Sequence, residues 1–178
     1  MTKPPEVMRT ERLTLRRPRP SDAEAVFDAY AADSEVARFV RWRPHSSVEE
    51  TEHYVAECVA AWGGDTRFPW VIELNEGGGP LGMVELRVAG FKAEVGYVLA
   101  RPFWGRGLAT EALRPVVGWA LSRPEIYRVW AVCDAENVAS ARVLEKAGME
   151  REGMLRRYIL HPNVSDEPRD SLCYAVVK

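Results

Sequence analysis

The sequence has few cysteines and few histidines. Cys58, Cys133 and Cys173 are far apart and form no Cys-x-x-Cys pair. This argues against a disulfide framework and a structural zinc site, so we expect the thiols to act as buried small hydrophobic side chains. The three histidines are equally scattered, which favours surface or hydrogen-bonded roles and predicts no metal centre.

A long apolar run and an excess of charge are also missing. No stretch approaches the roughly 18 apolar residues that span a bilayer, and the first residues lack the apolar core of a signal peptide. Lysine and arginine number 24 against 26 aspartates and glutamates, a formal net charge of −2. Charge therefore supports neither a nucleic-acid nor a membrane partner. We expect a cytoplasmic protein in which any anion site is local.

The chain has the composition of an ordinary globular domain. It contains 178 residues, of which 47% are hydrophobic, enough to bury one sizeable core. No internal repeat or linker divides it, so we expect a single domain over residues 1–178. The sequence leaves the oligomeric state open, a homodimer included.

Periodicity predicts alternating strands and helices. The patterns Ser21-x-x-Glu24 and Ser47-x-x-Glu50 indicate capping boxes at the N-termini of two helices. Residue alternation predicts strands, and apolar spacings of three and four predict helices. The expected strands cover residues 12–17, 68–74, 81–88, 93–99, 128–133, 158–160 and 171–177, and two later helices cover residues 108–120 and 137–147.

This order indicates a mixed α/β (α+β) fold whose sheet is mostly antiparallel. The strand–helix–strand passage from Glu94 to Cys133 predicts one parallel pair, because such a crossover normally returns parallel and right-handed. Neighbouring parallel strands that each precede a helix direct both helix N-termini to the same end of the sheet.

A sharp turn connects the strand that ends at Leu99 to the helix that begins near Leu108. Gly105 and Gly107 allow positive φ and close approach of a ligand to the backbone. Unpaired amides at the start of the helix then favour an anion, most naturally a phosphate. The turn does not match a dinucleotide fingerprint, because Thr110 stands where that motif needs its third glycine. It does not match a P-loop either, because no Gly-Lys-Ser/Thr follows.

Several stretches together resemble the GNAT superfamily of N-acetyltransferases, most closely the RimJ/RimL type that acts on ribosomal-protein N-termini. They are Arg101-Pro-Phe-Trp-Gly-Arg-Gly-Leu-Ala-Thr-Glu-Ala112, residues 128–132, residues 137–149 with Glu152-Gly153, and residues 10–16. The resemblance spans nearly the whole chain. It implies a GNAT fold with a twisted sheet, a central parallel pair that splays apart beyond Leu99, and about four helices.

The resemblance implies acetyl-CoA as the cofactor, with its pyrophosphate on the glycine turn. Pro102 stands where the family motif has Gln or Arg, and Arg101 is the candidate substitute. The cofactor-binding residues implied are Val98, Leu99, Arg101, Trp104, Gly105, Arg106, Gly107, Leu108, Ala109, Thr110, Asn137, Ser140 and Arg142.

The family mechanism implied is direct attack of an amine on the thioester. Glu94 and Glu85 are the candidate bases, and a solvated strand-face glutamate is the alternative for each. In the RimJ/RimL type, the serine of an Asn-x-x-Ser motif protonates the leaving thiolate. The resemblance gives this role to Ser140. Asn137 resembles the family residue that bonds the cofactor or a water, with helix capping as the alternative. Cys133 has no activating partner at a recognisable spacing, so a packing role is preferred.

Residues 38–45 form a basic and aromatic loop in which Arg38, Trp42 and Arg43 are the candidate acceptor-binding residues. A protein N-terminal α-amine is the expected acceptor. The alternatives are a small-molecule amine such as an antibiotic or polyamine, and a non-catalytic acyl-CoA-binding module on the same fold.

Overall fold

The computed structural model describes residues 2–178 as one mixed sheet flanked by helices. The strands are β1 (Val7–Arg9), β2 (Leu13–Arg16), β3 (Arg67–Leu74), β4 (Gly82–Ala89), β5 (Lys92–Leu99), β6 (Arg128–Asp134), β7 (Glu150–Ile159) and β8 (Arg169–Val177). The α-helices are α1 (Ala23–Val26), α2 (Ser34–Ala37), α3 (Val48–Ala61), α4 (Leu108–Ser122) and α5 (Val138–Lys146).

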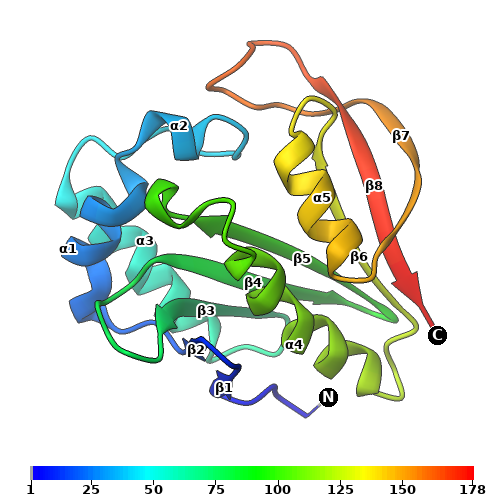
Figure 1. Cartoon of the computed structure of the whole chain (residues 1–178), viewed down its shortest axis with the longest axis horizontal. Coiled ribbons are helices and arrows are strands. Elements are labelled where there is room, and N and C mark those ends of the chain that lie inside the picture. The colour runs from blue at the N-terminus through cyan, green and yellow to red at the C-terminus, as the bar shows by residue number, and fades with distance from the viewer. Residues whose placement is uncertain (1) are drawn as a thin grey trace.

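The eight strands lie in the order β1-β2-β3-β4-β5-β6-β8-β7. All neighbours are antiparallel except β5 and β6, which are parallel. Figure 1 shows α4 and α5 packed on one face of this sheet and α1 and α3 on the other. The predicted fold class and parallel pair are therefore confirmed. Among the described residues no helix is long and apolar enough to cross a membrane.

Strand alternation divides the core between the two faces. The main hydrophobic cluster contains inward residues of β4 and β5, such as Leu86 and Val95, packed against Leu113 and Val116 of α4. A smaller cluster on the opposite face joins Cys58 of α3 to β3 and β4. The two faces of β5 therefore present different side chains to two different helix layers.

The parallel pair is short. Its three residue pairs are Lys92–Arg128, Ala93–Val129 and Glu94–Trp130, although β5 continues to Leu99 and β6 to Asp134. The strands therefore separate beyond Glu94, five residues earlier than the predicted divergence beyond Leu99. Figure 1 shows them spreading apart toward the N-terminus of α5. This separation leaves an opening in the middle of the sheet.

Several elements differ from the predicted ones at their ends. The first helix is broken into a 3-10 turn, α1 and a π-helical turn. At the helix starts, acidic side chains accept hydrogen bonds from backbone amides other than the predicted ones. Asp22 accepts from the Arg19 amide at 2.7 Å, and Glu50 accepts from the Ser46 amide at 2.7 Å. Residue alternation does not reveal β1, which is too short to show it, or most of β7, whose residues are largely exposed at the sheet edge.

A buried ion cluster joins the N-terminal segment to the sheet. Arg16, on β2, forms two hydrogen bonds with the Asp22 carboxylate at 2.7 and 2.9 Å. Its guanidinium also contacts Glu73 of β3 at 2.5 Å. The Arg16 and Asp22 side chains are 10% and 6% exposed, so removing the cation would leave a carboxylate buried without its partner.

We predict that Arg16→Met lowers the free energy of unfolding by about 3–5 kcal/mol, because the Asp22 charge loses its compensation. Arg157→Met is the control, since it removes an exposed pair with Glu167 and should change stability by less than about 1 kcal/mol. Urea unfolding measures both. Similar small losses in the two variants would contradict a structural role for the cluster.

Candidate active site

The turn between β5 and α4 has the backbone that the sequence predicts. Gly105 and Gly107 have φ angles of 71° and 77°, in a left-handed region that residues with a Cβ rarely adopt. Gly107 is the N-cap of α4, so the first amides of a 15-residue helix point outward from the turn. The Trp104 indole donates to the Leu99 carbonyl at 2.6 Å and ties the turn to the end of β5. The arrangement suits an anion.

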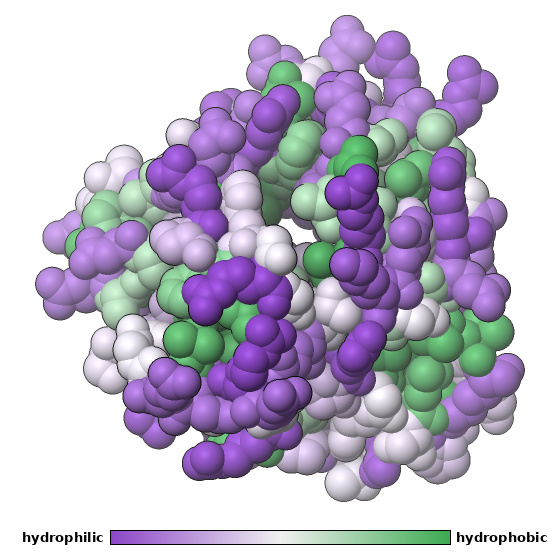
Figure 2. Space-filling view, viewed as in Figure 1, coloured by the Kyte–Doolittle hydropathy of each residue, from purple (hydrophilic) through white to green (hydrophobic). Residues whose placement is uncertain are grey.

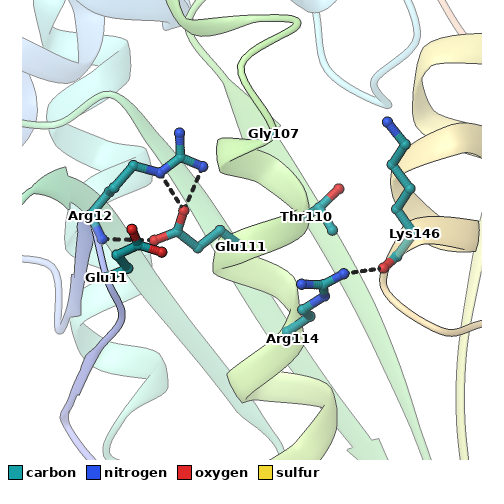
Figure 3. Close-up of a pocket in the computed structure, with 7 residues that line it drawn as sticks. All are labelled: Glu11, Arg12, Gly107, Thr110, Glu111, Arg114 and Lys146. Carbon is teal, nitrogen blue, oxygen red and sulfur yellow. Dashed lines mark hydrogen bonds and ion pairs between the residues drawn. The ribbon is translucent and has the colours of Figure 1, made fainter.

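The first turn of α4 is clamped to the β1–β2 connection. Glu111 accepts hydrogen bonds from the Thr10 hydroxyl at 2.6 Å and from the Arg12 amide and Nε at 2.8 and 2.7 Å. Arg12 also donates to the Arg106 carbonyl at 3.1 Å. Burial raises the pKa of Glu111, but these donors outweigh it and lower the pKa. Figure 3 shows the clamp directly beside Gly107.

A hollow of about 350 Å³ lies outside the glycine turn. Its walls include Gly107 and Thr110 of α4 and Lys146 of α5. Figure 3 shows the Lys146 chain rising from α5 opposite Thr110, and Arg114 donating to the Lys146 carbonyl, a bond of 2.8 Å. This places a cationic side chain across from the helix N-terminus.

A larger cleft of about 720 Å³ starts at the glycine turn and passes through the opening between β5 and β6. It is lined by residues of both sheet faces: Tyr97 and Ser140 on the α5 side, and Met83, Glu85 and Glu94 on the α3 side. Figure 2 shows a hollow in the surface with hydrophilic side chains around it. The cleft therefore connects the two faces of the sheet.

Most of the predicted site residues line this one cleft. They are Glu85, Glu94, Val98, Leu99, Trp104, Gly105, Gly107, Leu108, Ala109, Thr110, Asn137, Ser140, Arg142, Arg38 and Trp42. Three predicted residues do not line it. Arg101 is directed to Asp33, with Nε 3.1 Å from the carboxylate. Arg106 lies over the Phe103 ring at 5.5 Å, and Arg43 is exposed.

Ser140 is hydrogen-bonded to a tyrosine of β5. The Tyr97 hydroxyl lies 2.7 Å from Ser140 Oγ and 3.2 Å from the Ser140 carbonyl oxygen. Burial raises the pKa of Tyr97, which keeps the phenol protonated. Asn137 caps α5 by accepting from the Ser140 amide at 3.1 Å, and its side chain also lines the cleft. Two hydroxyl groups therefore meet where the cleft crosses the sheet.

Cys133 lines the cleft near Ser140 but is a poor nucleophile. Burial raises the pKa of its thiol to about 11, so little thiolate exists near neutral pH. A covalent acyl-enzyme at Cys133 is therefore disfavoured. Cys58 is likewise buried, and Cys173 is half-buried, which agrees with the predicted packing role for the first two.

The two candidate glutamates differ in how firmly they are paired. Glu85, 9% exposed at its side chain, contacts Arg67 at 2.9 Å and also pairs closely with Arg87. Glu94, 20% exposed, lies 3.6 Å from Arg41 and 3.8 Å from Arg87, beyond hydrogen-bond distance. Glu85 is thus held by two guanidinium groups, whereas Glu94 keeps accepting capacity toward the cleft.

Three residues of the cleft are absent from the predicted set: Tyr97 through its side chain, Arg87, and Arg41, which lies in the predicted acceptor loop of residues 38–45. Tyr97 continues the alternation of Ala93 and Val95 on β5. This alternation predicts that its side chain lies on the same face of the sheet as α5. Arg41 and Arg87 reach the cleft from a loop and from β4. No sequence pattern relates them, because their proximity arises only from the packing of the loop over the sheet.

A family model, the Acetyltransferase (GNAT) domain, matches residues 12–150. The chain is 31% identical to the uncharacterised N-acetyltransferase YoaA of Bacillus subtilis, with 97% of each chain covered. A GNAT-family acetyltransferase structure from Bacillus anthracis has a TM-score of 0.83 at 28% identity and covers 96% of this chain and 98% of its own.

The RimJ structure of Mycobacterium smegmatis, in complex with CoA-disulfide, has a TM-score of 0.81 at 26% identity. It covers 93% of this chain and 81% of its own. Sequence match, fold and cleft agree, and the chain belongs to the GNAT family of acetyltransferases.

Proposed function

We propose that this chain transfers the acetyl group of acetyl-CoA directly to a primary amine, the α-amine of a polypeptide N-terminus. The observation that carries the proposal is the cleft that crosses the sheet. The glycine turn stands at its first end, the Tyr97–Ser140 pair at its middle and Glu94 at its second end. A donor and an acceptor can therefore enter from opposite faces and meet between β5 and β6.

The turn fits the phosphates of coenzyme A. Amides at the N-terminus of α4 face the turn, and a Cβ added at Gly105 would meet no atom within 4 Å, so the backbone is open to a ligand. Arg142 and Lys146 follow one another at helical spacing on α5 and line the same cleft, where their charge would favour phosphate. Acetyl-CoA supplies an acetyl group activated as a thioester.

Glu94 is the base in this proposal. An amine must lose a proton to attack, and a carboxylate within reach of the cleft can accept it directly or through water. Glu85 is occupied by Arg67 and Arg87, so its role is to hold these arginines in place. Glu94, with only long contacts to arginine, is the freer acceptor.

Ser140 passes a proton to the leaving thiolate and takes one from the Tyr97 hydroxyl, and Tyr97 is reprotonated by water in the cleft. When the Tyr97 hydroxyl donates to Ser140 Oγ, the serine hydrogen is left to point into the cleft. Successive hydroxyl donors also polarise one another, which strengthens the last hydrogen bond. The proposal therefore assigns the proton-donating function to the pair rather than to Ser140 alone.

The test is release of coenzyme A thiol from acetyl-CoA, measured against N-terminal peptides, polyamines and aminoglycosides, with mass spectrometry of the acetylated product. Turnover of peptides with acetylation of the α-amine supports the proposal. Turnover of polyamines or aminoglycosides alone would reassign the acceptor. Binding of acetyl-CoA without any transfer would support an acyl-CoA-binding module instead.

We predict that saturating acetyl-CoA raises the melting temperature by about 5 °C or more, because a ligand that binds the native state stabilises it. Gly107→Ala should abolish this shift. Gly90→Ala is the matched control, since Gly90 also has positive φ, 60°, but lies in the β4–β5 turn. Both variants lose some stability from backbone strain, yet the control should keep the shift.

For the donor pair, Ser140→Ala should slow transfer roughly 10- to 100-fold with nearly unchanged affinity for acetyl-CoA. Tyr97→Phe should slow it by a smaller factor, and the double variant should be no slower than Ser140→Ala. Steady-state rates of the four proteins measure this coupling. Additive losses would show that Tyr97 does not act through Ser140.

For the base, Glu94→Gln should lower kcat by about 100-fold or more while the melting temperature stays nearly constant. Glu85→Gln should mainly lower stability, because Arg67 and Arg87 lose a buried partner. Rates at several pH values and melting curves separate the two effects. A larger kcat loss in Glu85→Gln than in Glu94→Gln, at equal stability, would reverse the assignment.

A further inference from the structure

Guanidinium groups converge on the acceptor end of the cleft. Arg38 and Arg41 come from the segment after α2, and Arg87 comes from β4. All three line a space that also has aromatic walls, including Phe39 and Trp42. Arg38 and Arg41 are exposed at the rim of this space, where water screens their mutual repulsion and leaves both guanidinium groups accessible to an anion.

Three carboxylates, those of Glu35, Glu85 and Glu94, line the same space, but they pair unevenly with these cations. Arg87 pairs with Glu85, whereas Arg41 has only the 3.6 Å contact with Glu94. The Arg38 guanidinium lies over the Phe39 ring at 5.0 Å and makes no ion pair within 4 Å among residues 2–178. Glu35 adds one exposed carboxylate at the rim. Arg38 and Arg41 thus remain able to bind a further anion.

The segment that carries these two arginines is held at both ends by one side chain. The Asn163 amide donates to the Ala37 carbonyl at 2.6 Å and to the Trp42 carbonyl at 2.7 Å. His161, in the same β7–β8 loop, contacts the Val40 carbonyl at 3.4 Å. The backbone between Ala37 and Trp42 is therefore ordered before a ligand arrives, which reduces the entropy cost of binding.

We propose that the acceptor carries a carboxylate close to its amine, which binds between Arg38 and Arg41. This inference rests on the proposed acetyl transfer to a primary amine, and it specifies the group beside that amine rather than the length of the acceptor. The amine is directed to Glu94, and the anion is placed on the guanidinium pair of the same segment. Guanidinium binds a carboxylate through paired hydrogen bonds, so this group fits better than a neutral amide.

Such an anion has two sources in a natural acceptor. It is the side chain of an acidic residue near a peptide N-terminus, or the α-carboxylate of a free amino acid. Both present the same chemistry to Arg38 and Arg41. Matched acceptors that differ only in this group separate the sources.

The experiment compares kcat/KM for Ser-Glu-Ala-Ala amide with Ser-Gln-Ala-Ala amide, and for serine with serinamide. In at least one pair the anionic member should be preferred about tenfold or more. The pair that shows the preference identifies the source. Arg38→Gln and Arg41→Gln should each remove most of the preference, mainly through KM, and leave the melting shift with acetyl-CoA unchanged.

Arg9→Gln is the control, because Arg9 is an exposed arginine of β1 at the far edge of the sheet, and it should keep the preference. Equal turnover of acid and amide in both pairs would overturn this inference while leaving acetyl transfer intact. Absence of any acetylated product from any primary amine would instead contradict the proposed function itself. Arg41→Glu gives a second readout, since it should shift preference toward a Ser-Lys peptide.

Discussion

The site depends on one constraint, the short pairing of β5 with β6. These parallel strands share three residue pairs and then diverge, although β5 continues to Leu99 and β6 to Asp134. A fully paired sheet would have separated the face covered by α5 from the face covered by α3. The divergence instead lets a single cleft reach Ser140 on one side and Glu94 on the other.

The charges that line this cleft differ from one end to the other. At the first end the outward amides of α4, with Arg142 and Lys146, favour phosphate. At the middle, two neutral hydroxyl groups meet in a partly buried position. At the second end arginines and glutamates lie together. Glu85 is tightly paired with arginine, and Glu94 is loosely paired. Each region therefore suits a different part of the proposed reaction.

Local sequence patterns predicted much of the fold because they reflect local physics. The apolar spacing of Leu113, Val116 and Ala120 set α4, and the glycines at 105 and 107 set its entry. Prediction was weaker where exposed residues form an edge strand, as in β7, and where another acidic residue took over capping, as Asp22 did. Edge strands and caps depend on neighbours that a local pattern does not include.

The sequence by itself determined the family, the order of most elements and the glycine turn, because each is carried by motifs whose own residues lie close together in the chain. The tertiary structure decided which side chains meet. It joined Tyr97 to Ser140 across 43 positions, distinguished Glu94 from Glu85 through their arginine partners, and held Arg38 and Arg41 over the sheet through Asn163. Such contacts arise from strand divergence and loop packing, and no spacing along the chain encodes them.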